Sequence, residues 1–151
     1  MIQNRIVTVF GAYGHTGRFV VQELRKRGFT PILSGRDAAK LKEAGNAHPG
    51  SEVRVATVDD PGSLDRALSG AAAVINCAGP FIDRAAPVID AAMRASIHYL
   101  DIAAEQASVR RTRAIAHPRF SLWRQSHEGE ARCAGRWCVE EISMQSLRRL
   151  W

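Results

Sequence analysis

Three glycines stand three residues apart near the amino terminus, in the segment Gly11-Ala12-Tyr13-Gly14-His15-Thr16-Gly17. Residues without a Cβ allow tight turns and let the backbone approach a ligand closely. Gly11 would permit the turn, Gly14 would let the chain reach phosphate groups, and Gly17 would let a helix pack against the preceding strand. That helix would aim free N–H groups at an anion, and the Thr16 hydroxyl could add a hydrogen bond. The pattern predicts a turn that holds a dinucleotide pyrophosphate; the alternative is a tight turn without a ligand.

A second candidate feature is Ser34-Gly35-Arg36-Asp37, at the end of the next predicted strand. Sites specific for NAD place a carboxylate at the end of this strand, where it binds the ribose 2′-hydroxyl. No acid occupies that end here, and the guanidinium of Arg36 can instead pair with the 2′-phosphate of NADP, with a further bond from the Ser34 hydroxyl. We therefore predict NADP(H) as the cofactor. Two alternatives stay open: Arg36 is merely solvated, or Asp37 faces the ribose instead of capping the next helix.

Two later segments follow strands of the same predicted sheet. Asp59 comes after the third strand, where it would contact the adenine amino group or cap the turn before the next helix. The segment Asn76-Cys77-Ala78-Gly79-Pro80-Phe81 leaves the fourth strand at the carboxyl edge of the sheet, where ligands bind. Its last four residues, Ala78, Gly79, Pro80 and Phe81, would form a loop beside the cofactor. We expect Cys77 to be a buried packing thiol rather than a nucleophile, because no base is assigned to it.

The elements that would position these residues alternate along the first 107 residues. Short apolar segments predict strands at Arg5–Phe10, Thr30–Ser34, Glu52–Val58, Ala73–Cys77 and His98–Ile102. Helical spacing of apolar residues, with capping residues and glycine stops, predicts helices at His15–Arg27, Asp37–Ala44, Pro61–Leu68 and Ala85–Ala95. This order predicts an α/β fold of the Rossmann type, a doubly wound parallel sheet of about five strands with helices on both faces.

Residues 108–151, called the C-terminal tail below, differ in composition from residues 1–107. Residues 1–107 hold 12 Lys or Arg against 11 Asp or Glu, whereas the tail holds 9 against 4, and all nine of its basic residues are arginine. The tail also contains all three tryptophans and no sustained helical or strand period. We predict a domain over 1–107 and an irregular tail with short helices at 109–116 and 140–150. One hypothesis for the change is a shifted reading frame near Val109.

The tail allows several interpretations. Arginine and tryptophan together could bind nucleic acid, by pairing with phosphates and stacking on bases, but the balanced charge of residues 1–107 argues against a nucleic-acid protein. His117, His127, Cys133 and Cys138 could suggest zinc, although their order and spacing match no common site. A basic tail could also present itself to an acidic partner, which makes a non-catalytic, NADP-responsive interaction protein the alternative function.

Several motifs together resemble the saccharopine dehydrogenase-like family, which includes saccharopine reductases and trans-acting enoyl reductases of lipid synthesis. They are the glycine segment 11–17, Ser34-Gly35-Arg36, Cys77-Ala78-Gly79-Pro80-Phe81 and His98-Tyr99-Leu100-Asp101-Ile102-Ala103-Ala104-Glu105. The resemblance implies NADP-dependent hydride transfer, with a cofactor lined by Gly11, Tyr13, Gly14, His15, Thr16, Gly17, Arg36, Gly79, Pro80 and Phe81. It places Tyr99 and Asp101 near the nicotinamide end, with strand packing as their alternative role. The family commonly has glycine where Ala104 stands.

Size and composition narrow the class of protein. Three cysteines are too few for a disulfide scaffold, no apolar segment is long enough to span a bilayer, and no leader precedes the first apolar segment, so we expect a cytoplasmic protein. Family members continue into a long substrate domain, and we expect this chain to be the truncated cofactor half of such an oxidoreductase. The substrate, a small molecule or a lipid, is not identified by the sequence, and self-association through uncovered apolar surface is a further expectation.

Overall fold

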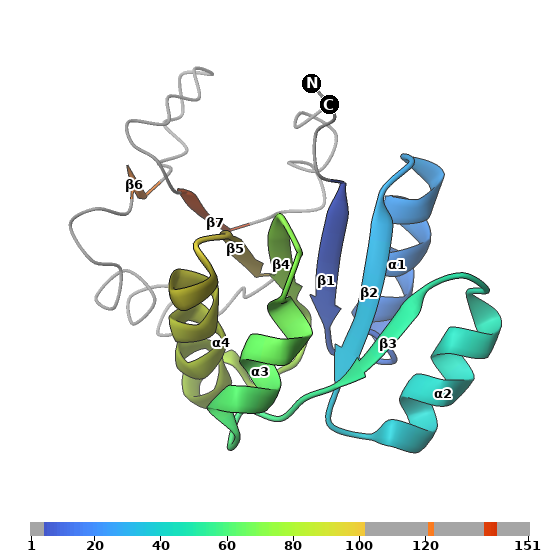
Figure 1. Cartoon of the computed structure of the whole chain (residues 1–151), viewed down its shortest axis with the longest axis horizontal. Helices are drawn as coiled ribbons and strands as arrows, with labels where there is room; N and C mark the ends of the chain where they lie inside the picture. Colours follow the sequence, from blue (N-terminus) through green and yellow to red (C-terminus); the bar gives the residue numbers. More distant parts are fainter. Residues whose placement is uncertain (1–4, 102–120, 123–137, 142–151) are drawn as a thin grey trace.

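The computed structural model of the chain describes residues 5–101, 121–122 and 138–141. The strands are β1 (Ile6–Phe10), β2 (Thr30–Gly35), β3 (Glu52–Val55), β4 (Ala73–Asn76), β5 (His98–Asp101), β6 (Ser121–Leu122) and β7 (Cys138–Glu141). The helices are α1 (His15–Lys26), α2 (Ala38–Ala47), α3 (Pro61–Leu68) and α4 (Phe81–Ala95) (Figure 1). The five strands and four helices predicted for residues 1–107 are confirmed, and the largest shift is the start of α4, four residues earlier than predicted.

The strands form one parallel sheet in the order β3-β2-β1-β4-β5-β7-β6. β1 lies between β2 and β4, and its Val9 is level with Leu33 on one side and Ile75 on the other. The chain builds outward from β1 to β3 and then returns to place β4 on the other side of β1. In open α/β sheets, ligands bind where the strand order reverses in this way, so the carboxyl ends of β1 and β4 mark the expected site.

The tail contributes the two strands beyond β5. β7 pairs with β5 and β6 pairs with β7, each in parallel. The helix predicted at 140–150 is wrong at its start, because Glu140 and Glu141 belong to β7, where they pair with Leu100 and Asp101. Pairing with an otherwise open sheet edge satisfies backbone groups that local helical spacing does not take into account. The helix predicted at 109–116 lies outside the described residues.

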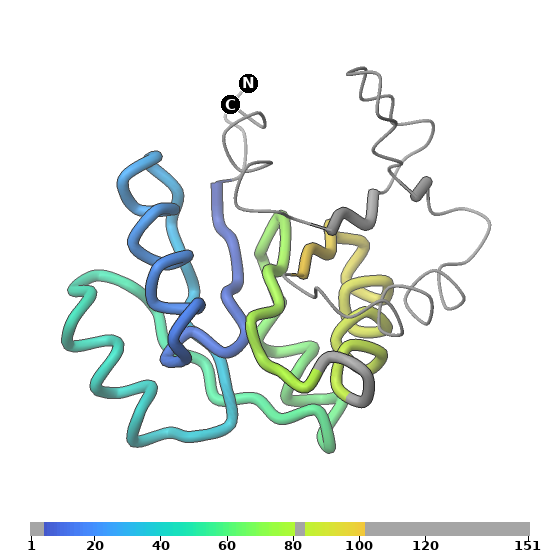
Figure 2. Tube along the Cα trace, turned by 180° about the vertical axis from the view of Figure 1, so that it is seen from behind, coloured from blue at the N-terminus to red at the C-terminus, as the bar shows by residue number. Residues whose placement is uncertain are grey.

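Helices cover both faces of the sheet, as predicted (Figures 1 and 2). On one face, side chains of α1 and α2 pack against Val9, Leu33 and Ile75. On the other face, side chains of α3 and α4 pack against Phe10 and Val74. Each layer of helices thus buries an apolar stripe against the strands, and the loops at the carboxyl edge are held between two packed faces.

The apolar stripe of α1 differs in one residue from its prediction. Phe19 shares the predicted helical spacing, but its side chain is 57% exposed. The buried face of α1 is instead formed by Gly17, Val20, Val21 and Leu24. Phe19 comes directly before Val20, about 100° around the helix, and so turns away from the sheet.

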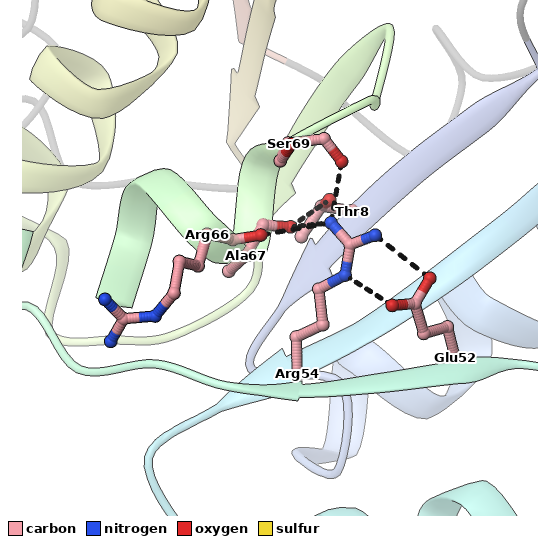
Figure 3. A network of polar contacts seen from close by, with 6 residues as sticks. All are labelled: Thr8, Glu52, Arg54, Arg66, Ala67 and Ser69. Carbon is pink, nitrogen blue, oxygen red and sulfur yellow. Dashed lines mark hydrogen bonds and ion pairs between the residues drawn. The ribbon is translucent and has the colours of Figure 1, made fainter. Parts of the chain in front are cut away.

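A guanidinium ties β3 to the carboxyl end of α3 (Figure 3). Arg54 Nη1 donates to the carbonyl oxygens of Arg66, Ala67 and Ser69 at 3.1, 3.3 and 2.7 Å, while Nε and Nη2 donate to the carboxylate of Glu52. The last carbonyls of a helix have no partner within the helix, so a cation placed there satisfies them and interacts favourably with the helix dipole. Arg54 therefore fixes the helix that follows the third strand.

Candidate functional site

The turn between β1 and α1 brings three stretches of backbone close together. Gly11 has a φ of +86°, and its N–H donates to the carbonyl oxygen of Ser34 at 2.8 Å. A Cβ on Gly11 would lie 2.9 Å from the backbone nitrogen of Ala78. A Cβ on Gly17 would overlap the carbonyl oxygen of Gly11. Glycine is therefore required at both positions, for the tight turn and for the close packing of α1 that the sequence predicts.

The amino end of α1 opens onto this turn. Gly14 is the N-cap residue; within the described residues no side chain caps the helix, and its first turn contains no acidic residue. The first N–H groups of a helix have no partner within the helix, and the helix dipole makes this end attractive to an anion. His15 is exposed and packs edge-on against Phe19, with ring centroids 5.3 Å apart, and Thr16 is half-buried. The turn thus fits a phosphate group.

The loop after β2 carries the cation that the sequence singles out. Arg36 is exposed and forms no hydrogen bond or ion pair within the described residues. Asp37 caps α2, where its Oδ1 accepts a hydrogen bond from the backbone nitrogen of Lys40 at 3.0 Å, and that bond lowers the pKa of the Asp37 carboxyl. Of the two alternatives for Asp37, the helix cap is the one that the geometry favours. Arg36 keeps its donors available for a ligand.

Ser34 acts in the structure through its backbone. Its carbonyl oxygen accepts hydrogen bonds from the N–H groups of Gly11 and Ala12, at 2.8 and 3.1 Å. Its hydroxyl is fully buried and has no hydrogen-bond partner in the described part of the chain. The predicted bond from this hydroxyl to a cofactor would require the hydroxyl to become accessible. The carbonyl, in contrast, already anchors the glycine turn to β2.

Asp59 lies after β3 and is exposed. Its carboxylate accepts a hydrogen bond from the Thr57 hydroxyl at 3.2 Å. The N-cap residue of α3 is Asp60, and the bond between Asp59 and Thr57 lies within the turn before Pro61, so the turn-capping alternative for Asp59 stays open. The adenine contact of Asp59 stays a prediction, and the carboxylate is accessible for it.

A buried polar network supports the loop after β4. Asn76 Nδ2 donates to the hydroxyl of Tyr99 at 3.1 Å, and that hydroxyl donates to Asp101 Oδ2 at 3.1 Å. Asn76 Oδ1 accepts from the backbone nitrogen of Ala78 at 3.0 Å. Burial, followed by the nearby Asp101 carboxylate, raises the pKa of Tyr99. The network therefore holds Ala78, whose backbone nitrogen is the atom nearest to the position of a Cβ on Gly11.

Tyr99 and Asp101 are both buried side chains of β5. Tyr99 is completely buried and Asp101 nearly so, and both lie on the α3 and α4 side of the strands. Their placement near a nicotinamide ring stays a prediction. In the same region the Gly79–Pro80 peptide bond is cis and both residues are exposed. The predicted loop is one residue shorter than expected, because Phe81 is the first residue of α4.

Cys77 has the environment of a packing thiol. It is partly buried and packs against the core on the α1 side of the sheet. Burial, and then the Asp101 carboxylate, raises the pKa of Cys77 to about 12. A thiol with such a pKa stays protonated near neutral pH and is a poor nucleophile. The structure therefore favours the packing role expected for Cys77.

The described part of the chain brings most predicted site residues to one edge of the sheet. The glycine turn, residues 36–37, Asp59 and the 78–80 loop follow the carboxyl ends of β1 to β4, and Ser34 is the last residue but one of β2. Sequence reasoning missed Asn76 and Lys40 as contributors. The signal for Asn76 was an amide in an otherwise apolar strand, which is buried only where hydrogen bonds satisfy it. The zinc alternative involves His117, His127 and Cys133, which lie outside the described residues.

The sequence matches the family model described as the saccharopine dehydrogenase NADP-binding domain over residues 7–133. The match includes part of the C-terminal tail. A probable mitochondrial saccharopine dehydrogenase-like oxidoreductase of Arabidopsis thaliana is 34% identical over 128 residues, which cover 75% of this chain and 28% of that protein. The human saccharopine dehydrogenase-like oxidoreductase is 32% identical over 117 residues, 66% of this chain and 27% of its own length. The chain thus spans about a quarter of the curated relatives it matches.

Solved structures agree with this fold. Triphenylmethane reductase from a Citrobacter species, solved in complex with NADP(H), superposes with a TM-score of 0.61 and 25% identity, covering 72% of this chain and 45% of the reductase. The apo saccharopine dehydrogenase (L-Glu forming) of Saccharomyces cerevisiae gives a TM-score of 0.60 at 19% identity, covering 70% and 23%. The second likeness concerns the fold alone. Separately, no helix among residues 5–101 has the length and apolarity needed to cross a membrane.

Proposed function

Because the chain belongs to the saccharopine dehydrogenase NADP-binding domain family, we propose that it is the cofactor-binding part of an NADP(H)-dependent oxidoreductase. The observation that carries this proposal is the turn from Gly11 to Gly17, where added Cβ atoms would meet backbone and the amino end of α1 has no side-chain cap. Such a cradle suits the pyrophosphate of a dinucleotide. The bound cofactor would supply the hydride chemistry, and the residues of this chain bind and orient it.

Arg36 is the residue that we assign to the adenosine 2′-phosphate. It stands directly after β2, it is exposed, and its neighbour Asp37 is engaged in capping α2. A guanidinium presents planar paired donors that match a phosphate, whereas NADH offers only a hydroxyl at the same position. NADPH should therefore bind more tightly than NADH.

The reaction belongs to the proposal as well. Reduction of an enoyl or imine group is the reaction class to test, in keeping with the enoyl and saccharopine reductases that the sequence resembles. We propose that residues beyond those described here, in this chain or in another, hold the substrate. The cytoplasmic location stays a prediction of the sequence.

Fluorescence titration of the full chain with NADPH and NADH tests the cofactor assignment. We expect NADPH to bind at least about tenfold more tightly, and Arg36→Ala to remove most of that difference, because one charge-assisted phosphate contact is worth about 1.5 to 3 kcal/mol. Lys42→Ala is the matched control, since it removes an exposed cation from α2 outside the site. Equal affinities of the wild-type chain for both cofactors would refute the assignment of Arg36.

A further inference from the structure

Tyr13 connects the glycine turn to the loop that carries Arg36. The side chain of Tyr13 starts after β1, but its ring reaches the end of β2, where a Cβ on Gly35 would lie only 2.6 Å from Tyr13 Cε1. The backbone nitrogen of Asp37 donates a hydrogen bond to the Tyr13 hydroxyl at 3.3 Å. One aromatic side chain therefore touches the residues on both sides of Arg36.

Tyr13 is held in place both at its backbone and at its ring. Arg18 Nε donates to the Tyr13 carbonyl oxygen at 3.0 Å, which fixes the backbone of the turn. Lys40 Nζ lies 5.9 Å from the centroid of the Tyr13 ring and 3.6 Å from Asp37 Oδ2. A cation within about 6 Å of an aromatic face is attracted to it. Tyr13, Asp37 and Lys40 thus form a connected group at the amino end of α2.

Arg36 stands beside this group, and its side chain is exposed and has no hydrogen bond or ion pair in the described part of the chain. Its backbone is bracketed by Gly35, which lies against the ring, and by Asp37, which is bonded to the hydroxyl. A long side chain on a loop loses conformational freedom when it binds a ligand, and a backbone that is already fixed reduces that loss. The arrangement restrains the backbone of Arg36 while leaving its guanidinium free.

We propose that Tyr13 is a positioning residue for cofactor choice. Its ring packs against Gly35 and its hydroxyl accepts a hydrogen bond from the Asp37 N–H, and these two contacts, called the Tyr13 clasp below, present Arg36 to the 2′-phosphate of NADP(H). This inference rests on the proposed function, since it assumes that Arg36 binds that phosphate. It differs from a simple lining role, because a contact with parts shared by NADPH and NADH would change both affinities equally. Tyr13 should instead change the ratio of the two affinities.

Three variants of the full chain test the clasp by titration with NADPH and NADH. Tyr13→Phe removes only the acceptor of the Asp37 N–H and should lower the NADPH preference about threefold; Tyr13→Ala removes the ring and should lower it about tenfold. Gly35→Ala keeps the tyrosine in the sequence, but the added Cβ would displace its ring. This variant should therefore resemble Tyr13→Ala. On the Arg36→Ala background each substitution should leave the preference unchanged, because contacts that act through one residue are not additive.

Hydrogen exchange gives a readout without any cofactor. In Tyr13→Phe the amide of Asp37 should exchange about tenfold faster than in the wild type, measured by NMR. Equal loss of affinity for both cofactors in the Tyr13 and Gly35 variants, with Arg36→Ala still removing the preference, would overturn the clasp and leave the proposed function intact. An unchanged preference in Arg36→Ala would instead refute the phosphate assignment, whatever the Tyr13 variants do.

Discussion

The carboxyl ends of β2 and of β5 carry polar side chains of opposite accessibility. After β2, Arg36 is exposed and Asp37 has a lowered pKa because the Lys40 backbone donates to its carboxylate. At the end of β5, Tyr99 and Asp101 are buried, and burial raises the pKa of Tyr99. The first group follows β2 and the second lies within β5 of the same sheet, yet only the first group offers a charge to a ligand.

The group after β2 is suited to recognising a ligand, whereas the buried group of β5 is suited to supporting the neighbouring loop. An exposed cation with a fixed backbone can pair with an anionic ligand, whereas buried polar groups must satisfy one another. Asn76 donates a hydrogen bond to the buried Tyr99 hydroxyl and accepts one from the backbone nitrogen of Ala78, which lies next to Gly11. The residues after β2 should therefore control which cofactor binds. The polar residues of β4 and β5 should control how stably the loop at residues 78–80 is held.

The largest expected effect comes from Gly17→Ala, which disturbs the turn that both groups adjoin. The added Cβ would overlap the Gly11 carbonyl oxygen, so the turn and α1 must move apart. Overpacking of this kind costs about 3 kcal/mol, and the displaced helix should weaken NADPH and NADH binding about 100-fold alike. Urea unfolding and fluorescence titration measure the two effects.

Gly62→Ala is the control for that substitution. Gly62 lies in α3, and a Cβ there would meet only side-chain atoms, the nearest at 3.3 Å. It should bind both cofactors like the wild type. Wild-type affinity in Gly17→Ala would contradict the geometry described for the turn.

The chain contains two tyrosines, and they form a matched pair for the comparison itself. Tyr99→Phe removes the acceptor of Asn76 Nδ2 and a donor to Asp101, inside the core. Leaving a buried donor without its partner costs about 2 kcal/mol, so urea unfolding should show a loss of that size. The NADPH to NADH ratio should stay at the wild-type value.

Tyr13→Phe should give the reverse result. The hydrogen bond to its hydroxyl is long, 3.3 Å, and only partly buried, so the free energy of unfolding should change by less than about 1 kcal/mol, while the cofactor ratio falls. If both variants changed the ratio, or if neither changed stability, the proposed division between recognition and support would be wrong.

Much of the fold follows from local patterns in the sequence. Pro61 at the first turn of α3 and Asp37 before α2 mark helix starts that the structure reproduces. The start of α4 was predicted four residues late, because Phe81 was assigned to the loop that leaves β4, whereas Pro80 is the N-cap residue and the helix begins at Phe81. The strand at Cys138–Glu141 was missed because its partner β5 is distant in sequence, and pairing with an edge depends on tertiary position.

The site could be predicted only where a residue type has one physical use. Glycines at 11 and 17 have such a use in the turn, and the structure requires glycine at both positions, whereas the role of Arg36 stays a prediction. The clasp by Tyr13 and the network of Asn76 and Tyr99 depend on which side chains meet across strands. The spacing of residues in a single sequence does not show which side chains of different strands come into contact.

An effect smaller than those of Gly17→Ala and Tyr99→Phe concerns Cys77 and appears only at alkaline pH. Its pKa is raised to about 12, chiefly by burial, whereas a thiol in an unfolded chain has a pKa of about 8.5. The unfolded state therefore loses this proton first, so the stabilisation is complete below about pH 8.5 and is lost as the pH rises toward 12. Near neutral pH the thiol should contribute only packing.

Cys77→Ala isolates this titration from that of the other groups. Between about pH 8 and about pH 9.5 the free energy of unfolding of the wild type should fall by about 1 kcal/mol more than that of Cys77→Ala. Parallel urea unfolding curves at the two pH values measure the difference. An equal fall in both proteins would mean that Cys77 ionises as readily in the folded chain as in the unfolded one. The Cys77 thiol would then have to be accessible to water in the folded chain.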